Sequence, residues 1–558
     1  MYLGVDVGGT HTDAVLLDGS LGLRAAAKVH TGADLVATLR EVLAEVLAGA
    51  DAAGVERLTV STTLGLNSLL TGTADPVGLI VTGGPGLALD PSCLGACGVR
   101  ILTAAQDHRG AEIAPLGAGE AGEAARGLAR EGARALVCGS KFGPKNPGIE
   151  ESVRAEAEAA FRGPVIAASS LFGGLNLPRR LASAVLNASV LRLYGDFLGQ
   201  LEEAVRSLGL AARVLVLKSD GGVMTAGEAR RVPAAALAAG PAASLLGLWS
   251  LDRGRDGDVL MADVGGTSTD LAVLSRGKPL LAPQGLRIAG RETLVRGLLT
   301  WSLALGGDTD LARGPAGFVP EPRRRGPALA LDPEGAAAGR PPTLTDALNV
   351  LGRAEVGDPG ISRAAFRKLG ADPEVLAAEA VAVFLGRLRE AADEFTDRVN
   401  RQPCYTVSEF LVDWRLAPAR AVLLGGPARS LAPLAGDYLG LPVSAPPEAS
   451  YANALGAALA RPTAEAELYA DTALETLSIP TLNVRRRIGR DYTLEDAKRD
   501  LLEAMAGAGR GAGGGAGPAQ DGGAFQFTLA ESFNQMGGRG RSGRVIRVKA
   551  QEAPGLMG

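Results

Sequence analysis

The chain has little of several things, and each shortage excludes a class of protein. Aromatic residues make up only 4% of its 558 residues. No apolar run approaches the roughly 18 residues that a membrane-spanning helix needs, and no basic, then apolar leader follows Met1, so we expect a cytoplasmic protein without a membrane partner. The cysteines are too few for a disulfide scaffold and too scattered for a zinc site, which favours thiols in a reducing compartment. They are Cys93, Cys97, Cys138 and Cys404.

The chain also lacks an excess of basic charge. Its formal net charge is −4, which gives no electrostatic footprint for nucleic acid. A basic segment near the C-terminus, 537–550, is expected to be a solvated stretch with one short strand. Small acidic or neutral molecules therefore remain the expected partners.

The length and the alternation of elements predict the architecture. A chain of this length exceeds the size at which a single core stops growing, so more than one domain is expected. Strand-like runs alternate with helical ones, which predicts α/β layering. We expect helices at 33–47, 178–207 and 373–401, and strands at 3–7, 14–17, 58–61, 76–82, 133–141 and 213–218.

Three regions are expected along the chain. We expect an N-terminal domain at 1–177, a second domain at 178–465, and a C-terminal extension at 466–558. The second domain carries a loop near 313–342, rich in Gly, Pro and Arg, which is either a lid-like functional loop or a poorly ordered insertion. The extension contains a Gly-rich linker at 507–523.

The strongest signal is a phrase that occurs twice. VDVGGTHTD spans 5–13 and ADVGGTSTD spans 262–270, each after an apolar run, and seven of the eight positions from the first Asp onward are identical. Every identity is separated by 257 positions, as Asp6 is from Asp263. The matched residues are Asp6, Val7, Gly8, Gly9, Thr10, Thr12 and Asp13, then Asp263, Val264, Gly265, Gly266, Thr267, Thr269 and Asp270.

The parts of this phrase favour a phosphate site. Two glycines let backbone N–H groups turn toward an anion, and hydroxyl side chains add donors. Carboxylates at the ends would repel phosphate unless a hard divalent cation lies between, so Mg²⁺ is implied together with a nucleotide. A plain β-hairpin would explain one copy. It does not require the same seven residues twice.

The phrase supplies most of the candidate site residues. Asp6 and Asp263 are the leading candidates for metal ligands, because each lies at the end of a strand, where the turn begins. Asp13 and Asp270 come second as catalytic or metal-binding groups, since each is also placed to cap its turn. The expected phosphate donors are Gly8, Gly9, Thr10, His11, Thr12, Gly265, Gly266, Thr267, Ser268 and Thr269. Gly306, Gly307 and Asp308 are further candidates for nucleotide binding, because glycine beside a carboxylate fits the close approach of a ligand.

Two related halves that each offer a phosphate hairpin resemble the superfamily of actin, sugar kinase and Hsp70 ATPases. The resemblance implies an α/β fold with two ribonuclease H-like, actin-type ATPase domains facing a central nucleotide cleft, plus a small C-terminal extension. It also implies that small residues at 452–460 lie on a helix that crosses another closely. The adenosine of ATP would be cradled by Gly425, Gly426 and Pro427.

The GGTxTD wording resembles the hydantoinase/oxoprolinase A-type family more specifically. Further fragments agree in order over about residues 1–460: STTLGLNSLL, DHRG, PKNPGIEE, LNAS, SDGG, AAGPAAS, LGGD and TLTDA. The chain departs from the family pattern at His11, where a large hydrophobic residue or Asn is usual. It also has Leu64 and Gly65 in a segment where the family carries a His, and neither can do acid–base work.

The resemblance implies ATP-dependent opening of a cyclic amide such as a hydantoin, 5-oxoproline or a related lactam. Phosphorylation of the amide oxygen would make a good leaving group. The cofactors would be ATP and Mg²⁺, and a second enzyme subunit is a possible partner. The alternatives are a small-molecule kinase, a subunit of an ATP-dependent carboxylase, and a nucleotide-switched reactivating or scaffold protein.

Several other polar residues have two readings. His108 and Arg109 either contact a substrate carboxylate or form a surface turn, and Asn187 is either a site residue or a satisfied interhelical group. Thr343 is expected to cap a helix. Asp220, beside two glycines, is a further site candidate.

Overall fold

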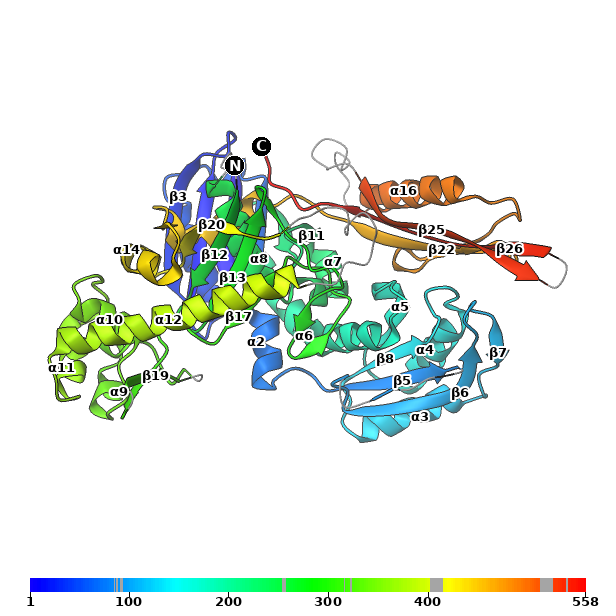
Figure 1. Cartoon of the computed structure of the whole chain (residues 1–558). Coiled ribbons are helices and arrows are strands. Elements are labelled where there is room, and N and C mark those ends of the chain that lie inside the picture. Colours follow the sequence, from blue (N-terminus) through cyan, green and yellow to red (C-terminus); the bar gives the residue numbers. More distant parts are fainter. Residues whose placement is uncertain are drawn as a thin grey trace.

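The computed structural model describes residues 1–84, 86, 89–90, 94–252, 257–315, 317–321, 324–401, 415–511, 525–537 and 540–558. Cys93 and Cys404 lie outside these residues, and Cys97 and Cys138 are free thiols. Within the described part of the chain, no helix combines the length and apolarity needed to cross a membrane. The fold is mixed α/β and contains several sheets (Figure 1).

The first sheet contains the first copy of the phrase. Its strand order is β11-β10-β4-β1-β2-β3, in which β1 and β2 form an antiparallel hairpin and β1, β4 and β10 run parallel. The strands are β1 (Tyr2–Val7), β2 (His11–Leu17), β3 (Leu23–His30), β4 (Arg57–Thr62), β10 (Arg213–Leu217) and β11 (Val223–Thr225). The helices of this part are α1 (Leu35–Val46), α2 (Leu64–Thr71), α6 (Leu177–Ser207) and α7 (Ala226–Arg231).

The second sheet repeats the core of this arrangement. Its order is β14-β13-β12-β20-β21, with β17 also beside β13, and β20 runs parallel to β12 as β4 does to β1. Asp6 lies opposite Asp13 in one hairpin and Asp263 opposite Asp270 in the other, so the duplicated phrase has the same register in both. The strands are β12 (Asp258–Val264), β13 (Thr269–Ser275), β14 (Lys278–Pro279), β17 (Thr300–Leu303), β20 (Pro418–Leu424) and β21 (Val443–Ser444).

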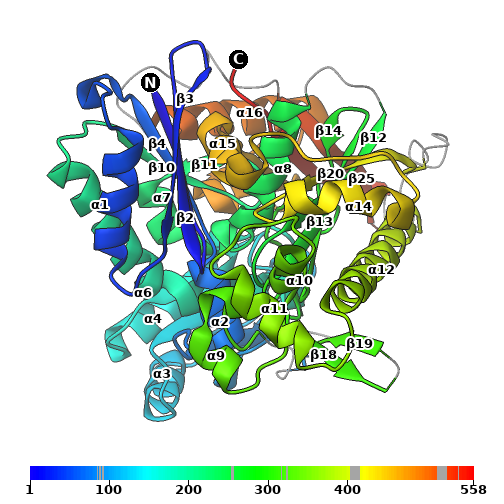
Figure 2. The same cartoon turned by 90° about the vertical axis from the view of Figure 1, so that its left-hand side faces the viewer.

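Helices surround the second sheet and connect it to the first. Asp372 caps the long helix α12 by accepting from two backbone N–H groups. The helices are α8 (Ala239–Leu251), α10 (Leu344–Val350), α11 (Pro359–Arg367), α12 (Pro373–Asn400), α14 (Ala428–Leu439) and α15 (Ala452–Leu459). Figure 2 shows the two sheets side by side, with α8 and α15 between them.

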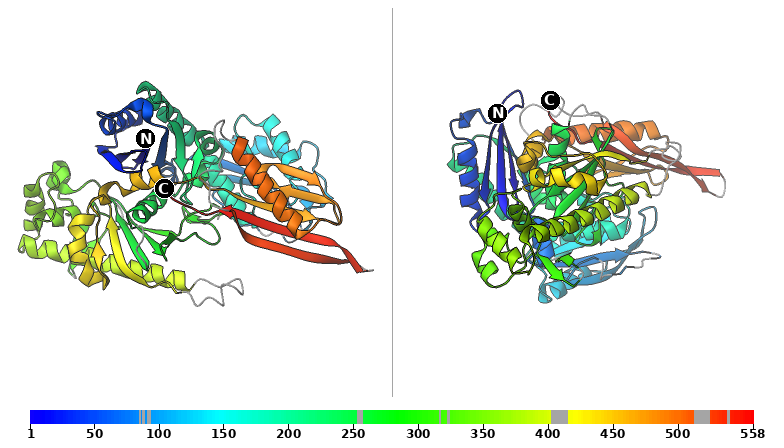
Figure 3. Two further views of the ribbon diagram at one scale, coloured as in Figure 1. Left: turned by 90° about the horizontal axis from the view of Figure 1, so that it is seen from above. Right: turned by 60° about the vertical axis from the view of Figure 1, so that its left-hand side comes forward.

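Two further sheets lie together at the other end of the molecule (Figure 3). The order of one is β7-β6-β5-β8-β9 and that of the other β24-β23-β22-β26-β25. The former comprises β5 (Val77–Gly83), β6 (Gly98–Gln106), β7 (Glu112–Ala114), β8 (Ala135–Ser140) and β9 (Val165–Ala167), with α3 (Glu120–Arg130), α4 (Gly148–Ala160) and α5 (Ala168–Leu171). The latter comprises β22 (Glu465–Asp471), β23 (Thr476–Ile479), β24 (Val484–Arg487), β25 (Phe525–Gly537) and β26 (Gly540–Glu552), with α16 (Leu494–Gly511).

The sheets cross the domain boundaries expected from sequence. β10 and β11 follow residue 177 yet belong to the first sheet, because β10 pairs in parallel with β4. The expected linker at 507–523 begins as the last turn of α16, and 512–523 lie outside the described residues. The basic segment at 537–550 is mostly β26, which pairs along β25, so it is far more regular than expected.

The described residues of the segment 313–342 contain regular elements, so they are more ordered than a poorly ordered insertion, and the lid-like functional loop stays a prediction. The segment contains the ends of a short hairpin, a 3₁₀ turn at Leu329–Leu331 and a short helix. The hairpin strands are β18 (Leu311–Gly314) and β19 (Gly317–Pro320), the helix is α9 (Pro333–Ala337), and a second small hairpin earlier in the chain pairs β15 (Arg287–Ile288) with β16 (Arg291–Glu292).

α8 and α15 cross with their backbones in contact. A Cβ atom added at Gly456 would lie 2.0 Å from the carbonyl oxygen of Ala243, and one at Gly247 would lie 2.1 Å from that of Ala452. α15 also presses on the first sheet, since a Cβ at Gly4 would lie 2.0 Å from a carbonyl oxygen of this helix. The close crossing expected at 452–460 is therefore present, and glycine is what permits it.

Gly456→Ala should destabilise the protein by about 2 kcal/mol or more, because the new methyl group can be accommodated only if one helix moves. Gly195→Ala in α6 is the matched control, since a Cβ there meets nothing within 4 Å. It should stabilise slightly, by up to about 1 kcal/mol, through helix propensity. Denaturant unfolding measures both, and equal stability of the two variants would contradict the packing argument.

Candidate functional site

Each hairpin turn presents unused backbone donors. The first glycine N–H closes the turn, from Gly8 to the oxygen of His11 at 3.1 Å and from Gly265 to that of Ser268 at 2.9 Å. The next two N–H groups of each turn donate no hydrogen bond within the described residues, and they belong to Gly9, Thr10, Gly266 and Thr267. Adjacent free N–H groups in a turn form an anion-binding concavity.

The two turns face each other closely. A Cβ added at Gly266 would lie 4.0 Å from the hydroxyl oxygen of Thr10. An anion bound by one turn would therefore lie close to the donors of the other. The structure thus brings together the two halves of the duplicated phrase, 257 residues apart.

A polar bridge joins the aspartates that end the two central strands. Asn453 Nδ2 donates to Asp6 Oδ2 at 3.3 Å. Ser244 Oγ lies 2.9 Å from Asn453 Oδ1 and 2.5 Å from Asp263 Oδ2. Ser244 comes from α8 and Asn453 from α15, so the close helix crossing positions both carboxylates.

The aspartates of the two hairpins raise one another's pKa values. Burial, with the charges of Asp13 and Asp263, raises the pKa of Asp6 to about 7. Burial, with the charges of Asp263 and Asp6, raises the pKa of Asp270 to about 7. Lys28 opposes the rise at Asp13, because its ammonium lies 2.6 Å from Asp13 Oδ1. The site is thus a concentration of negative charge that a cation would stabilise.

The carboxylates fit Mg²⁺ held jointly with phosphate better than an all-protein metal cage. Among the described residues, no group of three or more His, Cys, Asp or Glu side chains is arranged to hold a metal ion. Mg²⁺ typically uses one or two carboxylates, waters and substrate phosphates. Asp6 Oδ1 and the neighbouring hydroxyl of Ser61 are both buried, and apart from each other neither has a hydrogen-bond partner in the described part of the chain. Asp6 therefore has an oxygen to offer.

A second loop docks on the second turn. Gly307 N donates to the oxygen of Gly265 at 2.8 Å, and Asp308 N to that of Gly266 at 2.7 Å. Gly306 must be glycine, because a Cβ there would lie 2.6 Å from the Gly266 oxygen. The expected residues Gly306, Gly307 and Asp308 therefore border the turn.

The Gly-Gly-Pro loop after β20 reaches the same place. Gly425 has φ +89°, and a Cβ there would lie 2.7 Å from Asp263 Oδ1. The ring of Pro427 would contact a side chain at Gly307, at 3.1 Å from its Cβ. Gly425, Gly426 and Pro427 thus adjoin the second hairpin and its docked loop.

Besides the N–H groups of Gly8 and Gly265, which close the turns, three further expected phosphate donors have other surroundings. The hydroxyls of Thr12 and Thr269 are buried and bond within the protein, at 2.9 Å to Thr31 Oγ1 and 2.5 Å to the oxygen of Leu305. They hold the turns in place and are not free to donate to a ligand. His11 is exposed, and its ring lies edge-on to that of His30 at 5.8 Å between centroids.

The residues with two readings have structural partners. Arg109 forms a bidentate ion pair with Asp471, at 3.0 Å to each oxygen, which links the two sheets at the far end of the molecule. Asn187 is a satisfied interhelical group, which donates to the oxygen of Arg231 and accepts from the N–H of Ala234. Thr343 caps α10 in a capping box with Asp346. Asp220 pairs with Arg296 and accepts from the hydroxyl of Thr463.

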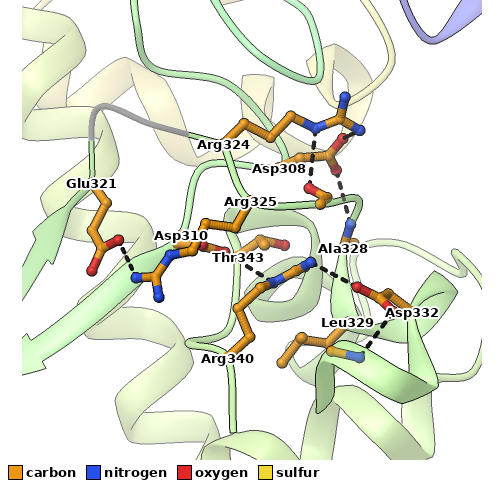
Figure 4. Close-up of polar contacts among 12 residues, drawn as sticks. Asp308, Asp310, Glu321, Arg324, Arg325, Ala328, Leu329, Asp332, Arg340 and Thr343 are labelled. Atoms are coloured by element: carbon orange, nitrogen blue, oxygen red, sulfur yellow. Dashed lines mark hydrogen bonds and ion pairs between the residues drawn. The ribbon is translucent and has the colours of Figure 1, made fainter. Parts of the chain in front are cut away.

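Four residues at the site were not identified from the sequence. Ser244 and Asn453 lie within fragments noted in the sequence analysis, but nothing in the sequence around them indicates a role for either side chain. Lys28 and Arg324 have no local pattern at all. Arg324 Nη2 donates to Asp308 Oδ2 at 2.8 Å (Figure 4). Arg324 Nη1 donates to Thr10 Oγ1 at 3.3 Å.

The protein is therefore a mixed α/β protein with two copies of a turn whose free N–H groups can bind an anion. Carboxylates cluster beside these turns. The chain belongs to the hydantoinase/oxoprolinase family. The family profile described as Hydantoinase/oxoprolinase matches residues 180–466, and that of the Hydantoinase/oxoprolinase N-terminal region matches residues 2–161.

Two relatives of this chain are named enzyme subunits. The acetophenone carboxylase gamma subunit of Aromatoleum aromaticum is 27% identical over 402 residues, which cover 62% of this chain and 52% of that protein. The caprolactamase subunit alpha of Pseudomonas jessenii is 25% identical over 314 residues, 50% of this chain and 44% of that protein. The chain thus spans about half the length of these relatives.

Two solved structures share the fold. The nucleotide-free structure of acetone carboxylase has a TM-score of 0.74 at 18% identity and covers 100% of this chain and 87% of that chain. The ATP-dependent caprolactamase from Pseudomonas jessenii has a TM-score of 0.68 at 17% identity, with 99% and 87% covered. At these identities the likeness concerns the fold alone.

The raised pKa of Asp6 predicts how stability depends on pH. Between the unfolded value of 3.8 and about 7, native Asp6 keeps a proton that the unfolded chain releases, so its contribution to stability is lost as pH rises. Asp6→Asn should therefore stabilise the protein more at pH 8 than at pH 5, by at least about 1 kcal/mol. Urea unfolding without Mg²⁺ and nucleotide measures the difference, and parallel pH profiles would contradict it.

Proposed function

We propose that this chain binds Mg-ATP between its two hairpin turns and uses it to open a cyclic amide. Two ribonuclease H-like, actin-type ATPase domains would face the nucleotide cleft. The observation that carries the proposal is the pair of turns with free N–H groups, which face each other and end in aspartates of identical register.

The substrate class follows from what phosphorylation accomplishes. A lactam carbonyl is a poor electrophile, so transfer of the terminal phosphoryl of ATP to the amide oxygen, with release of ADP, activates the carbon. Water then adds to that carbon, and cleavage of the C–N bond with a proton delivered to nitrogen leaves an acyl phosphate. A second water hydrolyses this group to a carboxylate and inorganic phosphate. A hydantoin, 5-oxoproline or related lactam fits this sequence.

The residues of the cleft would position and stabilise rather than react covalently. Asp6 and Asp263 would hold Mg²⁺, directly or through water. The free N–H groups would cradle phosphate oxygens, and the loop of Gly425 would border the adenosine. Asp13 and Asp270 would orient the attacking oxygen or move its proton.

Acid–base work would fall to these carboxylates because the segment at α2 offers none. A Cβ at Gly65 would lie 2.7 Å from a methyl group of Leu237 and 2.8 Å from the ring of Tyr194, so no longer side chain fits there. Asp270, whose pKa is about 7, is the cleft carboxyl suited to exchange a proton near neutral pH.

The relatives support the ATP-dependent lactam chemistry and a partner subunit. One is a caprolactamase subunit, and a caprolactamase with the same fold is named ATP-dependent. The second candidate is a subunit of an ATP-dependent carboxylase, which the acetophenone carboxylase gamma subunit favours. Both chemistries begin by activating an oxygen derived from a carbonyl, so one nucleotide site serves either.

Mg²⁺-dependent binding tests the nucleotide site. Asp6→Asn and Asp263→Asn should each weaken Mg-ATP binding about 10- to 100-fold, while ATP without Mg²⁺ binds unchanged or tighter because negative charge is removed. Asp196→Asn in α6, whose side chain is 62% exposed, is the control. Calorimetry measures the affinities, and unchanged Mg-ATP binding in both site variants would refute the proposal.

Substrate-dependent turnover tests the reaction. Release of ADP and phosphate should rise severalfold with a member of a panel of hydantoins and lactams, with or without a co-purified second subunit. Stimulation only by a ketone with bicarbonate would instead identify the carboxylase. Turnover indifferent to every small molecule but raised by a partner protein would exclude both enzymes and favour a switch.

A further inference from the structure

Arg324 joins the two hairpins from outside both of them. Its guanidinium donates to the hydroxyl of Thr10 in the first turn at 3.3 Å and to Asp308 beside the second turn at 2.8 Å. Its Nε donates to the oxygen of Gly326 at 3.0 Å. The side chain is 25% exposed. Figure 4 shows it lying against Asp308.

The position of this guanidinium coincides with the candidate phosphate site. Thr10 supplies both its hydroxyl to Arg324 and one of the free N–H groups of the first turn. Asp308 Oδ2 lies only 2.8 Å from where a Cβ at Gly266 would be, and Gly266 carries a free N–H of the second turn. An anion held by either pair of donors therefore lies within reach of Arg324.

A network of ion pairs fixes the segment that carries Arg324. The buried carboxylate of Asp310 pairs with Arg325 at 3.1 Å and with Arg340 at 3.2 Å, and Arg340 also pairs with Asp332 at 2.8 Å (Figure 4). These pairs connect the start of the segment to its end. A guanidinium on a rigid support loses less entropy when it binds a ligand.

We propose that Arg324 is a catalytic residue that binds the terminal phosphate of ATP and leaves Asp308 for the phosphate oxygens when nucleotide enters. The inference rests on the proposed function and deepens it. Asp308 accepts from the guanidinium through Oδ2 alone, while its Oδ1 accepts from the N–H of Ala328 at 3.2 Å. A phosphate oxygen can therefore take the place of Oδ2 at the guanidinium, and a second phosphate oxygen can complete a bidentate pair.

The chemical role is neutralisation of charge during transfer. As the bond between the terminal phosphorus and the ADP oxygen breaks and the bond to the amide oxygen forms, negative charge accumulates on the phosphoryl oxygens. A bidentate guanidinium stabilises that charge, as do arginines that other phosphoryl-transfer enzymes supply. The segment 313–342 would thereby contribute directly to catalysis.

Comparison of ATP with ADP isolates a contact to the terminal phosphate. Arg324→Ala should weaken Mg-ATP binding about 10- to 100-fold and leave Mg-ADP nearly unchanged, and should lower turnover by about 10³-fold or more. Arg324→Lys should restore part of the ATP affinity but little turnover, because a point charge cannot bind two oxygens. Calorimetry and phosphate release on the full chain, or on its complex with any second subunit, measure these effects.

Arg313→Ala is the matched control for damage to the segment. Arg313 lies at the start of the same segment but outside the ion-pair network of Arg325 and Arg340. It pairs with Glu379 at 3.9 Å and donates to the oxygen of Leu369 at 3.1 Å, so this variant should keep the preference for ATP. Asp308→Asn provides a second test. Removing the competing carboxylate should strengthen ATP binding relative to ADP. If the ion pair were merely structural, Asp308→Asn and Arg324→Ala would change the ratio of ATP to ADP affinity in the same direction.

The outcomes separate the two levels of the hypothesis. If the unaltered protein binds nucleotide and Arg324→Ala keeps its ratio of ATP to ADP affinity, the role of Arg324 is refuted and the nucleotide site stands. If the unaltered protein binds neither nucleotide, the proposed function and the role of Arg324 both fall. An equal loss of ATP preference in Arg313→Ala would also refute a direct contact.

Discussion

The backbone contact between α8 and α15 is the constraint on which the candidate site depends. Gly247 and Gly456 let the helices touch, and α15 at the same time lies on the first sheet through Gly4. Ser244 precedes Gly247 by three residues, and Asn453 precedes Gly456 by three, so each shares a helix face with its glycine. The faces that form the crossing therefore also form the polar bridge between the strand-end aspartates. A shift of either helix would separate the two halves of the site.

The electrostatics of the site run against stability. Burial and mutual repulsion raise the pKa values of its carboxyls, which means that their charged forms are disfavoured in the native protein. Lys28 compensates Asp13, and Arg324 compensates Asp308, but the buried Oδ1 of Asp6 has no partner among the described residues apart from the hydroxyl of Ser61. Such local conflict is typical of functional sites, where a ligand supplies what the chain leaves out. In the proposed binding mode, Mg²⁺ supplies the missing positive charge.

The hairpins could be predicted from sequence because their determinants are local: an apolar strand, a Gly-Gly turn and a second apolar strand follow one another within a few residues. The helices expected at 178–207 and 373–401 are present as α6 (Leu177–Ser207) and α12 (Pro373–Asn400), and a proline lies in the first turn of each. The membership of β10 in the first sheet could not be predicted, since strand pairing across more than a hundred residues leaves no local trace. The same holds for Arg324 and Lys28, whose partners lie on other segments. Thr12 and Thr269 were expected to bind ligand because sequence cannot distinguish a hydroxyl that binds phosphate from one that supports a turn.

Duplication explains the presence of two turns, but differences between the copies are what can assign them roles. Burial raises the pKa of both return-strand aspartates; at Asp13 the ammonium of Lys28 opposes the rise, whereas at Asp270 only the Ser302 hydroxyl opposes it, and the pKa there reaches about 7. When two equivalent carboxyl groups lie in different surroundings, one can stay charged while the other exchanges protons. The second turn alone carries the docked loop of Asp308, and with it the anchor of Arg324. A symmetric clamp would hold a triphosphate without distinguishing its ends, so the proposed phosphoryl transfer requires the asymmetry that the second half has acquired.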